Sequence, residues 1–312
     1  MSVNVKMKDY MQPILLVSAI ILGSFFGLAF FQLDDLLIEV AIISLLFFIF
    51  YNVPLNKLTK DIKNKKFLTI AWVSNFIIIP LIAFLLASLF VDNSSLVFIG
   101  LIIYLIAPCT DWVLGFTKLA KGDVELNSIL LPINLISQIL LLPVYLMLFS
   151  SNKASIPFDA FFETFLVWII FPFIIAKALH YLVAKTNYLK KSTKLAENLT
   201  TLSLVLLVFF IFNSNINILI ENLGLLPQIF IVILIFFIVT YYLVKYISKY
   251  FRLKRKEEIS LAMTTAARNA PLMLGVSLVL FPEAVLIHLV LIIGMLVEFP
   301  HLITLTYLLK KN

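Results

Sequence analysis

The sequence predicts an all-α polytopic membrane protein with ten transmembrane helices, arranged as two inverted five-helix repeats with broken helices 4 and 9. Three observations predict this fold. The 312 residues are 62% hydrophobic and only 13% charged, and apolar runs of about 20 residues recur along the whole chain. Basic residues concentrate in alternate connecting segments. Two apolar segments, one in each half, are interrupted by proline beside polar or charged residues.

The predicted spans are long enough to cross a bilayer and carry few charges inside. They cover residues 11–31, 36–55, 67–90, 96–119, 125–149, 158–183, 199–220, 226–248, 259–281 and 284–308. We expect a single transmembrane transporter domain over residues 1–312, with repeat one at about 11–150 and repeat two at about 158–309. Because five is odd, the second repeat enters the membrane from the opposite side, which makes the fourth and ninth spans equivalent. The repeat is inferred from topology, since no clear residue identity links the halves.

The distribution of positive charge predicts the orientation. Of the 24 basic residues, 21 lie in the termini, in the loops that follow the even-numbered spans, or at the ends of those spans that face these loops. Lys153 alone lies in the opposite loops, and Lys177 and Arg268 lie inside spans. The positive-inside rule then places a multi-pass protein in the cell membrane with both termini in the cytoplasm. The net charge of +7 is therefore no sign of nucleic-acid binding.

Several function classes are excluded by what the sequence lacks. It has no nucleophile–base constellation, so we expect no enzyme, and no cofactor or metal site is predicted. Cys109 is the only cysteine, which rules out an internal disulfide. No phosphate-binding GxxxxGK[ST] loop is present, so transport must draw on an ion or solute gradient unless a separate ATPase subunit exists.

The two interrupted segments are the candidate pathway. They read Ile106-Ala107-Pro108-Cys109-Thr110-Asp111-Trp112 and Thr265-Ala266-Ala267-Arg268-Asn269-Ala270-Pro271. Pro108 and Pro271 are predicted helix breaks, which free backbone groups that only protein or a water-filled cavity can satisfy. Asp111 and Arg268 lie roughly 10 and 15 Å from the cytoplasmic ends, at similar depth. Either they form a structural ion pair that locks the crossing, or at least one contacts substrate or a coupling ion, and the two readings are compatible.

Cys109 has two readings. It is either a small buried hydrophobe or, beside Thr110, a soft ligand for a thiophilic solute. Asn269, with the hydroxyls of Thr264 and Thr265, either coordinates sodium or binds an oxyanion, or it joins helices by hydrogen bonds.

The fifth and tenth spans add further polar candidates. Glu298 and His301 are three residues apart and share a helix face, which suits a proton relay, although a position near the membrane interface is the favoured interpretation for His301. Asn134 and Gln138 are four apart on one face of the fifth span. They either line the same cavity or bond helices together.

The run APCTDWVL (107–114), followed by LAKGD (119–123), resembles the fourth span of arsenite permeases of the arsenical-resistance type. These proteins belong to the bile acid/sodium symporter superfamily (bile acid/arsenite/riboflavin transporters). AARNAPL (266–272), leading to Phe281-Pro282, and GMLVEFPH (294–301) are similar to other segments of that superfamily, so the resemblance covers essentially the whole chain. It implies two five-helix inverted repeats, a panel domain that moves against a core domain, and broken helices 4 and 9 that cross in the core. It also implies proton-driven export of arsenite or antimonite. The functional cysteine of the permeases maps onto Cys109.

Two positions depart from the family pattern. A functional glutamate of the permeases falls at Pro271, and Asp111, Arg268 or Glu298 is left to take over its charge. A Ser-Asn pair that helps to hold sodium in the sodium-coupled branch falls at Val113 and Leu114, which cannot bind sodium through their side chains.

Three functional hypotheses follow. The first is proton-driven export of arsenite or antimonite, which confers arsenic resistance. The alternative is an ion-coupled symporter of a small organic anion, with Arg268 as the counter-charge and Na⁺ or H⁺ as the coupling ion. The third is a membrane sensor or structural subunit without transport. The expected partners are a small-molecule or inorganic oxyanion-type substrate, a coupling ion and the lipid bilayer, with no nucleic acid.

Overall fold

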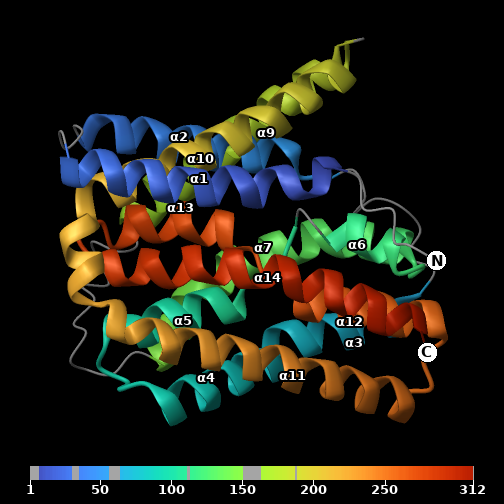
Figure 1. Ribbon diagram of the computed structural model, residues 1–312. Helices are drawn as coiled ribbons and strands as arrows, with labels where there is room; N and C mark the ends of the chain where they lie inside the picture. Colours follow the sequence, from blue (N-terminus) through green and yellow to red (C-terminus); the bar gives the residue numbers. More distant parts are fainter. Residues whose placement is uncertain are drawn as a thin grey trace.

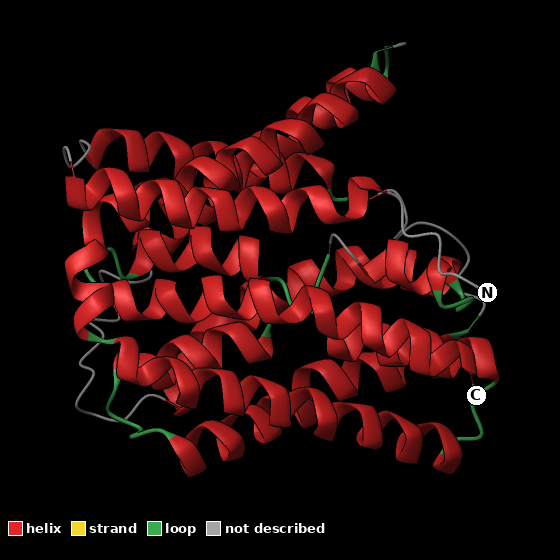
Figure 2. Cartoon of the chain, in the orientation of Figure 1, coloured by secondary structure: helices red, strands yellow, loops and turns green. Residues whose placement is uncertain are grey.

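The computed structural model describes residues 7–29, 35–55, 64–110, 113–149, 163–186 and 188–311, and the regular structure in these ranges is helical (Figures 1 and 2). Six of the described helices are long and apolar enough to cross a membrane: Lys65–Phe90, Val124–Phe149, Glu163–Ala184, Leu189–Glu221, Leu223–Tyr250 and Val285–Lys310. Shorter apolar helices cover Ile14–Ala29, Leu37–Asn52, Leu96–Ile106 and Ala270–Leu280. The expected all-helical membrane protein is confirmed at this level, whereas the ten-span count and the inverted repeat stay predictions.

The described part of the chain folds into a series of helices. In chain order they are α1 (Met7–Ala29), α2 (Asp35–Asn52), α3 (Lys65–Val73), the π-helical η2 (Ser74–Ile78), α4 (Ile79–Phe90), α5 (Leu96–Ile106), α6 (Val113–Leu119), α7 (Val124–Phe149), the π-helical η3 (Leu166–Ile170), α9 (Phe171–Ala184), α10 (Leu189–Glu221), the short 3₁₀ turn η4 (Leu223–Leu225), α11 (Leu226–Tyr250), α12 (Arg255–Ala266), α13 (Ala270–Leu280) and α14 (Val285–Lys311).

Local sequence signals explain several boundaries. Ser95 caps α5, because its Oγ accepts a hydrogen bond of 3.1 Å from the Phe98 amide. Asn64 caps α3 in the same way, with Oδ1 accepting from the Phe67 amide at 3.0 Å. Pro227 stands in the first turn of α11, where its missing amide proton leaves no hydrogen bond unmade.

The helices form two packed groups (Figure 1). Helices α1, α2, α9 and α10 pack on one another, and we call them the four-helix layer. The remaining helices, α3 to α7 and α11 to α14, form what we call the helix bundle. The two groups meet where α2 contacts α13 and where α10 contacts α14. This seam is where the candidate site lies.

One end of the molecule collects the start of α1 and the end of α14 (Figure 1). The start of α3 and the end of α11 lie at the same end and are joined there, since Lys66 Nζ donates to the Phe251 carbonyl at 2.6 Å. Asn64 Nδ2 also donates to Glu257 Oε1 at 2.6 Å. Two segments in which the sequence analysis found concentrated positive charge therefore lie together. Their cytoplasmic location stays a prediction.

Within the four-helix layer, α1 and α10 approach each other closely. Gly23 and Gly27 are four residues apart on one face of α1, and a Cβ at either position would overlap a backbone carbonyl of α10, that of Phe209 or that of Asn213. Small residues four apart allow such close helix packing in membranes. The contact ties α1 to the layer.

We predict that Gly27→Ala lowers the stability of the detergent-solubilised protein by about 1–3 kcal/mol, because the added methyl group must push α1 away from α10. Gly115→Ala in α6 is the matched control, since a Cβ there meets no heavy atom of the described residues within 4 Å and alanine is the better helix former. Thermal unfolding of the two variants measures the difference. Equal melting temperatures would show that the contact is not tight.

Candidate functional site

Two helices are interrupted, between Ile106 and Val113 and between Ala266 and Ala270, and the interrupted segments cross, with Pro108 inside the first interruption and Pro271 in the first turn of the helix after the second. The fourth predicted span consists of α5 and α6, and the ninth consists of α12 and α13. Between the half-helices, Pro108 and Arg268 face each other in an isolated antiparallel β-bridge. Two backbone hydrogen bonds join the extended segments: Cys109 N to Ala267 O at 2.9 Å, and Asn269 N to Ala107 O at 2.8 Å. Each segment thus satisfies backbone groups of the other, as an apolar interior demands.

Arg268 closes the ends of both half-helices. Its side chain is fully buried. Nη1 donates to the carbonyl of Leu105 in α5 at 2.8 Å, and Nη2 donates to the carbonyls of Thr264 and Thr265 in α12, at 3.1 and 2.6 Å. Carbonyls in the last turn of a helix have no partner within it, and a cation is favoured at this end. The guanidinium also lies over the ring of Phe236, 5.5 Å from its centroid.

Glu298 is the carboxylate that reaches the crossing from α14. It is 3% exposed, and Oε1 accepts a hydrogen bond of 3.0 Å from the backbone amide of Arg268. His301 has a different environment, since its ring stacks on Phe237 of α11 with 3.8 Å between centroids. The two side chains proposed as a proton relay are thus engaged with different partners. Asp111 lies outside the described residues, and so does its predicted pair with Arg268.

Thr110 and Asn269 are brought together by the crossing, because Asn269 Nδ2 donates to Thr110 Oγ1 at 3.1 Å. Cys109 is 1% exposed and belongs to an apolar cluster that includes Phe116 and Phe299. Its sulfur-ligand role stays a prediction.

Thr265 bonds within its own helix, since Oγ1 donates to the carbonyl of Leu261 at 2.8 Å.

A second polar cluster lies in the bundle next to Arg268. Asn75 of η2 and Asn134 of α7 each donate through Nδ2 to Thr264 Oγ1, at 3.2 Å in both cases. All three residues are at most 1% exposed, and the Oδ1 atoms of both asparagines have no hydrogen-bond partner among the described residues. Gln138, one turn beyond Asn134, is buried, and within the same ranges neither of its amide atoms is bonded. Uncharged oxygens of this kind can coordinate a hard cation such as Na⁺.

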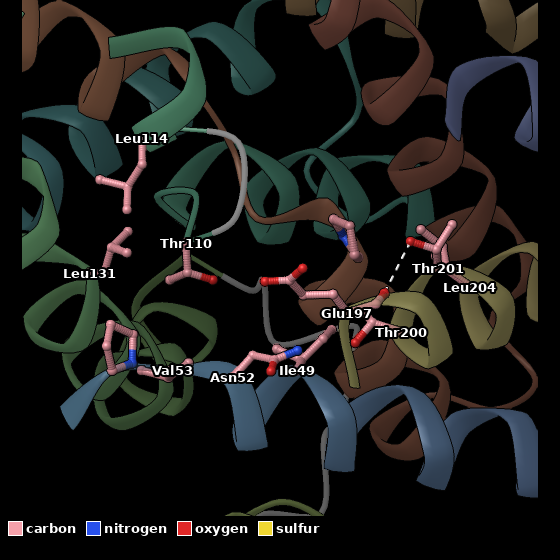
Figure 3. A pocket seen from close by; sticks show the side chains of 12 residues that line it. Ile49, Asn52, Val53, Thr110, Leu114, Leu131, Glu197, Thr200, Thr201 and Leu204 are labelled. Atoms are coloured by element: carbon pink, nitrogen blue, oxygen red, sulfur yellow. Dashed lines mark hydrogen bonds between the residues drawn. The ribbon is translucent and has the colours of Figure 1, made fainter. Parts of the chain in front are cut away.

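A cavity of about 380 Å³ opens at the seam between the crossing and the four-helix layer (Figure 3). Thr110 and Pro271 line it from the bundle, whereas Asn52 of α2 and Glu197 and Thr200 of α10 line it from the layer. Figure 3 shows the Thr110 hydroxyl and the Glu197 carboxylate turned toward the same space. Thr110 and Pro271, both in the interrupted segments, therefore line one cavity together with residues of α2 and α10 that the sequence analysis did not identify.

The charge of this cavity is set by one residue. Glu197 is the only charged side chain among the twelve described residues that line it. Asn52 Oδ1, also in the lining, has no hydrogen-bond partner in the described part of the chain. The nearby Lys177 of α9 caps the end of α2, since Nζ donates to the carbonyls of Val53 at 2.6 Å and Tyr51 at 3.3 Å. Hydrogen-bond acceptors and hydroxyls thus dominate the polar lining.

Glu197 was missed because of where the seventh span was expected to start. The prediction began at residue 199, where the apolar run begins, but α10 begins at Leu189. Lysine and glutamate are good helix formers, so the helix continues past the apolar run into a charged turn. Asn75 was missed although the polar pair Ser74-Asn75 inside an apolar span was a visible signal.

Interrupted apolar helices that cross beside a cavity are the architecture of a secondary transporter. The model of the Sodium Bile acid symporter family matches residues 39–222, more than half of the 312-residue chain. The chain belongs to this family and is therefore a symporter-type, multi-pass membrane transporter. The match runs from α2 to the end of α10 and contains the first broken segment but not the second. No curated protein matches the chain.

We predict that Arg268→Ala lowers the free energy of unfolding by about 3 kcal/mol or more, because three buried carbonyls lose their donors. Arg268→Lys keeps the charge but not the planar fork, so it recovers only part of the loss. Arg252→Ala, at an exposed arginine, is the control. Thermal unfolding in detergent measures the three variants. The capping role is excluded if Arg268→Ala has the same melting temperature as Arg252→Ala.

Proposed function

We propose that this protein is a secondary active transporter in which the four-helix layer moves relative to the helix bundle and exposes a solute at the crossing to either side. The observation that carries the proposal is the cavity at the seam, where Thr110 and Pro271 of the broken helices face α2 and α10. A solute held there contacts both moving parts. Alternating access requires a site in this position.

For the substrate we propose trivalent arsenic or antimony, exported at the expense of the proton gradient. Arsenous acid is uncharged at neutral pH and carries three hydroxyl groups. The acceptor-rich lining, with the Glu197 carboxylate and the Asn52 amide oxygen, suits a hydroxylated solute without negative charge. Thr110 and Asn269 are the proposed hydrogen-bonding groups at the crossing, Cys109 is the proposed transient sulfur ligand, and Asp111 is the proposed proton carrier.

A second candidate is sodium-coupled transport of a small organic anion. Two observations favour it: the description of the matched family, and the amide oxygens of Asn75 and Asn134 beside Thr264, which suit a sodium ion. The hydrogen bonds of Arg268 argue against this candidate. Nη1 and Nη2 are bonded to carbonyls inside the bundle, so the guanidinium is a poor counter-charge for a solute in the cavity.

The decisive experiment is arsenite flux into everted membrane vesicles, with and without a proton uncoupler. We expect accumulation that the uncoupler abolishes and that Cys109→Ser lowers at least about tenfold, because a lost ligand weakens binding by about 1.4 kcal/mol or more. Full accumulation in Cys109→Ser removes the sulfur ligand from the mechanism. Absence of arsenite movement by folded protein rejects arsenite export.

The second candidate gives its own prediction. If sodium couples transport, uptake of a labelled carboxylate into right-side-out vesicles depends on external Na⁺, and Thr264→Val abolishes that dependence by removing the central hydroxyl of the amide cluster. Thr306→Val is the matched control, since Thr306 is similarly buried but its hydroxyl donates within α14, to the Leu302 carbonyl. Loss of sodium dependence in both variants would show a general defect instead.

A further inference from the structure

We propose that a second cavity, at the opposite ends of α2, α10 and α13, is a binding site for small solutes that carry hydrogen-bond donors and no negative charge. The inference rests on the proposed transport function, since it treats this cavity as the other mouth of the same path. The inference goes beyond the proposed function in two ways: it assigns a second binding site, and it states that the transport path excludes anionic solutes.

The position of the cavity supports this reading. Its volume is about 650 Å³, within the range of small-molecule sites. It is lined by Glu39 near the start of α2, by Ser214 and Asn215 in the last third of α10, and by Glu283 and His288 after the end of α13. The first cavity touches the other end of each of these three helices. The two cavities therefore lie on either side of the crossing along the same seam.

His288 gives this site a ligand-directed group. It is 1% exposed, lines the cavity, and its Nε2 has no hydrogen-bond partner within the described ranges. Backbone groups of Ser277 and Phe281 lie beside the imidazole. A neutral imidazole has one nitrogen that donates and one that accepts, so an unbonded Nε2 is a group that a polar solute can pair with. A buried, unbonded ring nitrogen of this kind is a site for a polar group brought by a solute, and the carboxylates of Glu39 and Glu283 in the same lining accept hydrogen bonds from it.

The wall formed by α10 is opened at the same place. Asn215 has non-helical backbone angles, φ −122° and ψ 18°, inside the helix. Its Nδ2 donates to the Ile211 carbonyl at 3.2 Å. The neighbouring Ser214 Oγ is buried at the cavity and has no hydrogen-bond partner in the part of the chain that the structure describes. The irregular backbone at Asn215 therefore lies beside an unbonded hydroxyl, that of Ser214, which a solute in this cavity could reach.

The charges of the lining set the selectivity. Glu39 from α2 and Glu283 from the segment between α13 and α14 are the charged side chains of this cavity, and the described lining from α10, α13 and η3 is uncharged. Together with Glu197 in the first cavity, the described linings contain three carboxylates and neither lysine nor arginine. A cleft lined by one sign of charge concentrates the opposite sign and repels its own. Both mouths therefore disfavour anions.

The test uses charged thiol reagents and does not depend on transport. In a Cys109→Ala background, Ser214→Cys places a single thiol in the cavity, and Gly224→Cys places one in the α10–α11 turn, where a Cβ meets no described heavy atom within 4 Å. Cationic and anionic methanethiosulfonates of similar size are applied to each variant. We expect the cationic-to-anionic rate ratio to be about tenfold higher at position 214 than at 224. Adding Glu39→Gln and Glu283→Gln should bring the two ratios together.

An equal ratio at the two positions, a faster anionic reagent at 214, or a thiol at 214 that neither reagent reaches would each overturn the proposal. Ile218→Cys, also in the lining, replaces Ser214→Cys if that variant does not fold. Charge selectivity at position 214 together with absent arsenite flux would reject the proposed substrate and leave this site standing.

Discussion

A backbone carbonyl inside an apolar bundle must find a donor, and two interrupted helices expose several of them at one point. The fold solves this with the Arg268 guanidinium, which bonds the carbonyl of Leu105 at the end of α5 and those of Thr264 and Thr265 at the end of α12. The antiparallel backbone bridge at Pro108 supplies further pairs. The position of the crossing, the cavity beside it and the polar cluster behind it all depend on this arrangement.

The same solution is used at the seam, where Lys177 of α9 bonds the carbonyls at the end of α2. Both basic residues that the sequence places inside predicted spans thus stabilise helix ends. A cation that bonds carbonyls is a poor partner for a solute anion, so the polar character of the path is left to carboxylates, hydroxyls and amides. This difference in roles is the basis for our proposal of an uncharged hydroxylated solute in place of an organic anion.

The helix breaks could be predicted from the sequence, because proline beside a buried charge is rarely compatible with an uninterrupted membrane helix. Thr110 and Asn269 were identified as polar groups beside the breaks and Glu298 as a polar candidate in the tenth span, and all three meet at the crossing or its edge. The contacts of Arg268 could not be predicted, since its partners are backbone groups that leave no trace in residue identity. Glu197 escaped notice because hydropathy ends a span where the apolar run ends, whereas α10 continues as a helix into the charged turn. Which residues of α2 and α10 face the crossing is decided by packing between distant segments, and periodicity alone does not specify it.

The half-helices have an electrical consequence. Helices α5 and α13 contain 11 residues each, about 16 Å of helix, so each reaches only about half-way through a bilayer. With a cavity on either side of the crossing, the low-dielectric barrier is thinner than the membrane itself. Most of the membrane potential then falls across the few residues of the crossing, and a charge that moves a short distance there traverses most of the field. In the proposed alternating-access mechanism, a small displacement of the four-helix layer would therefore carry a bound cation through most of the membrane potential.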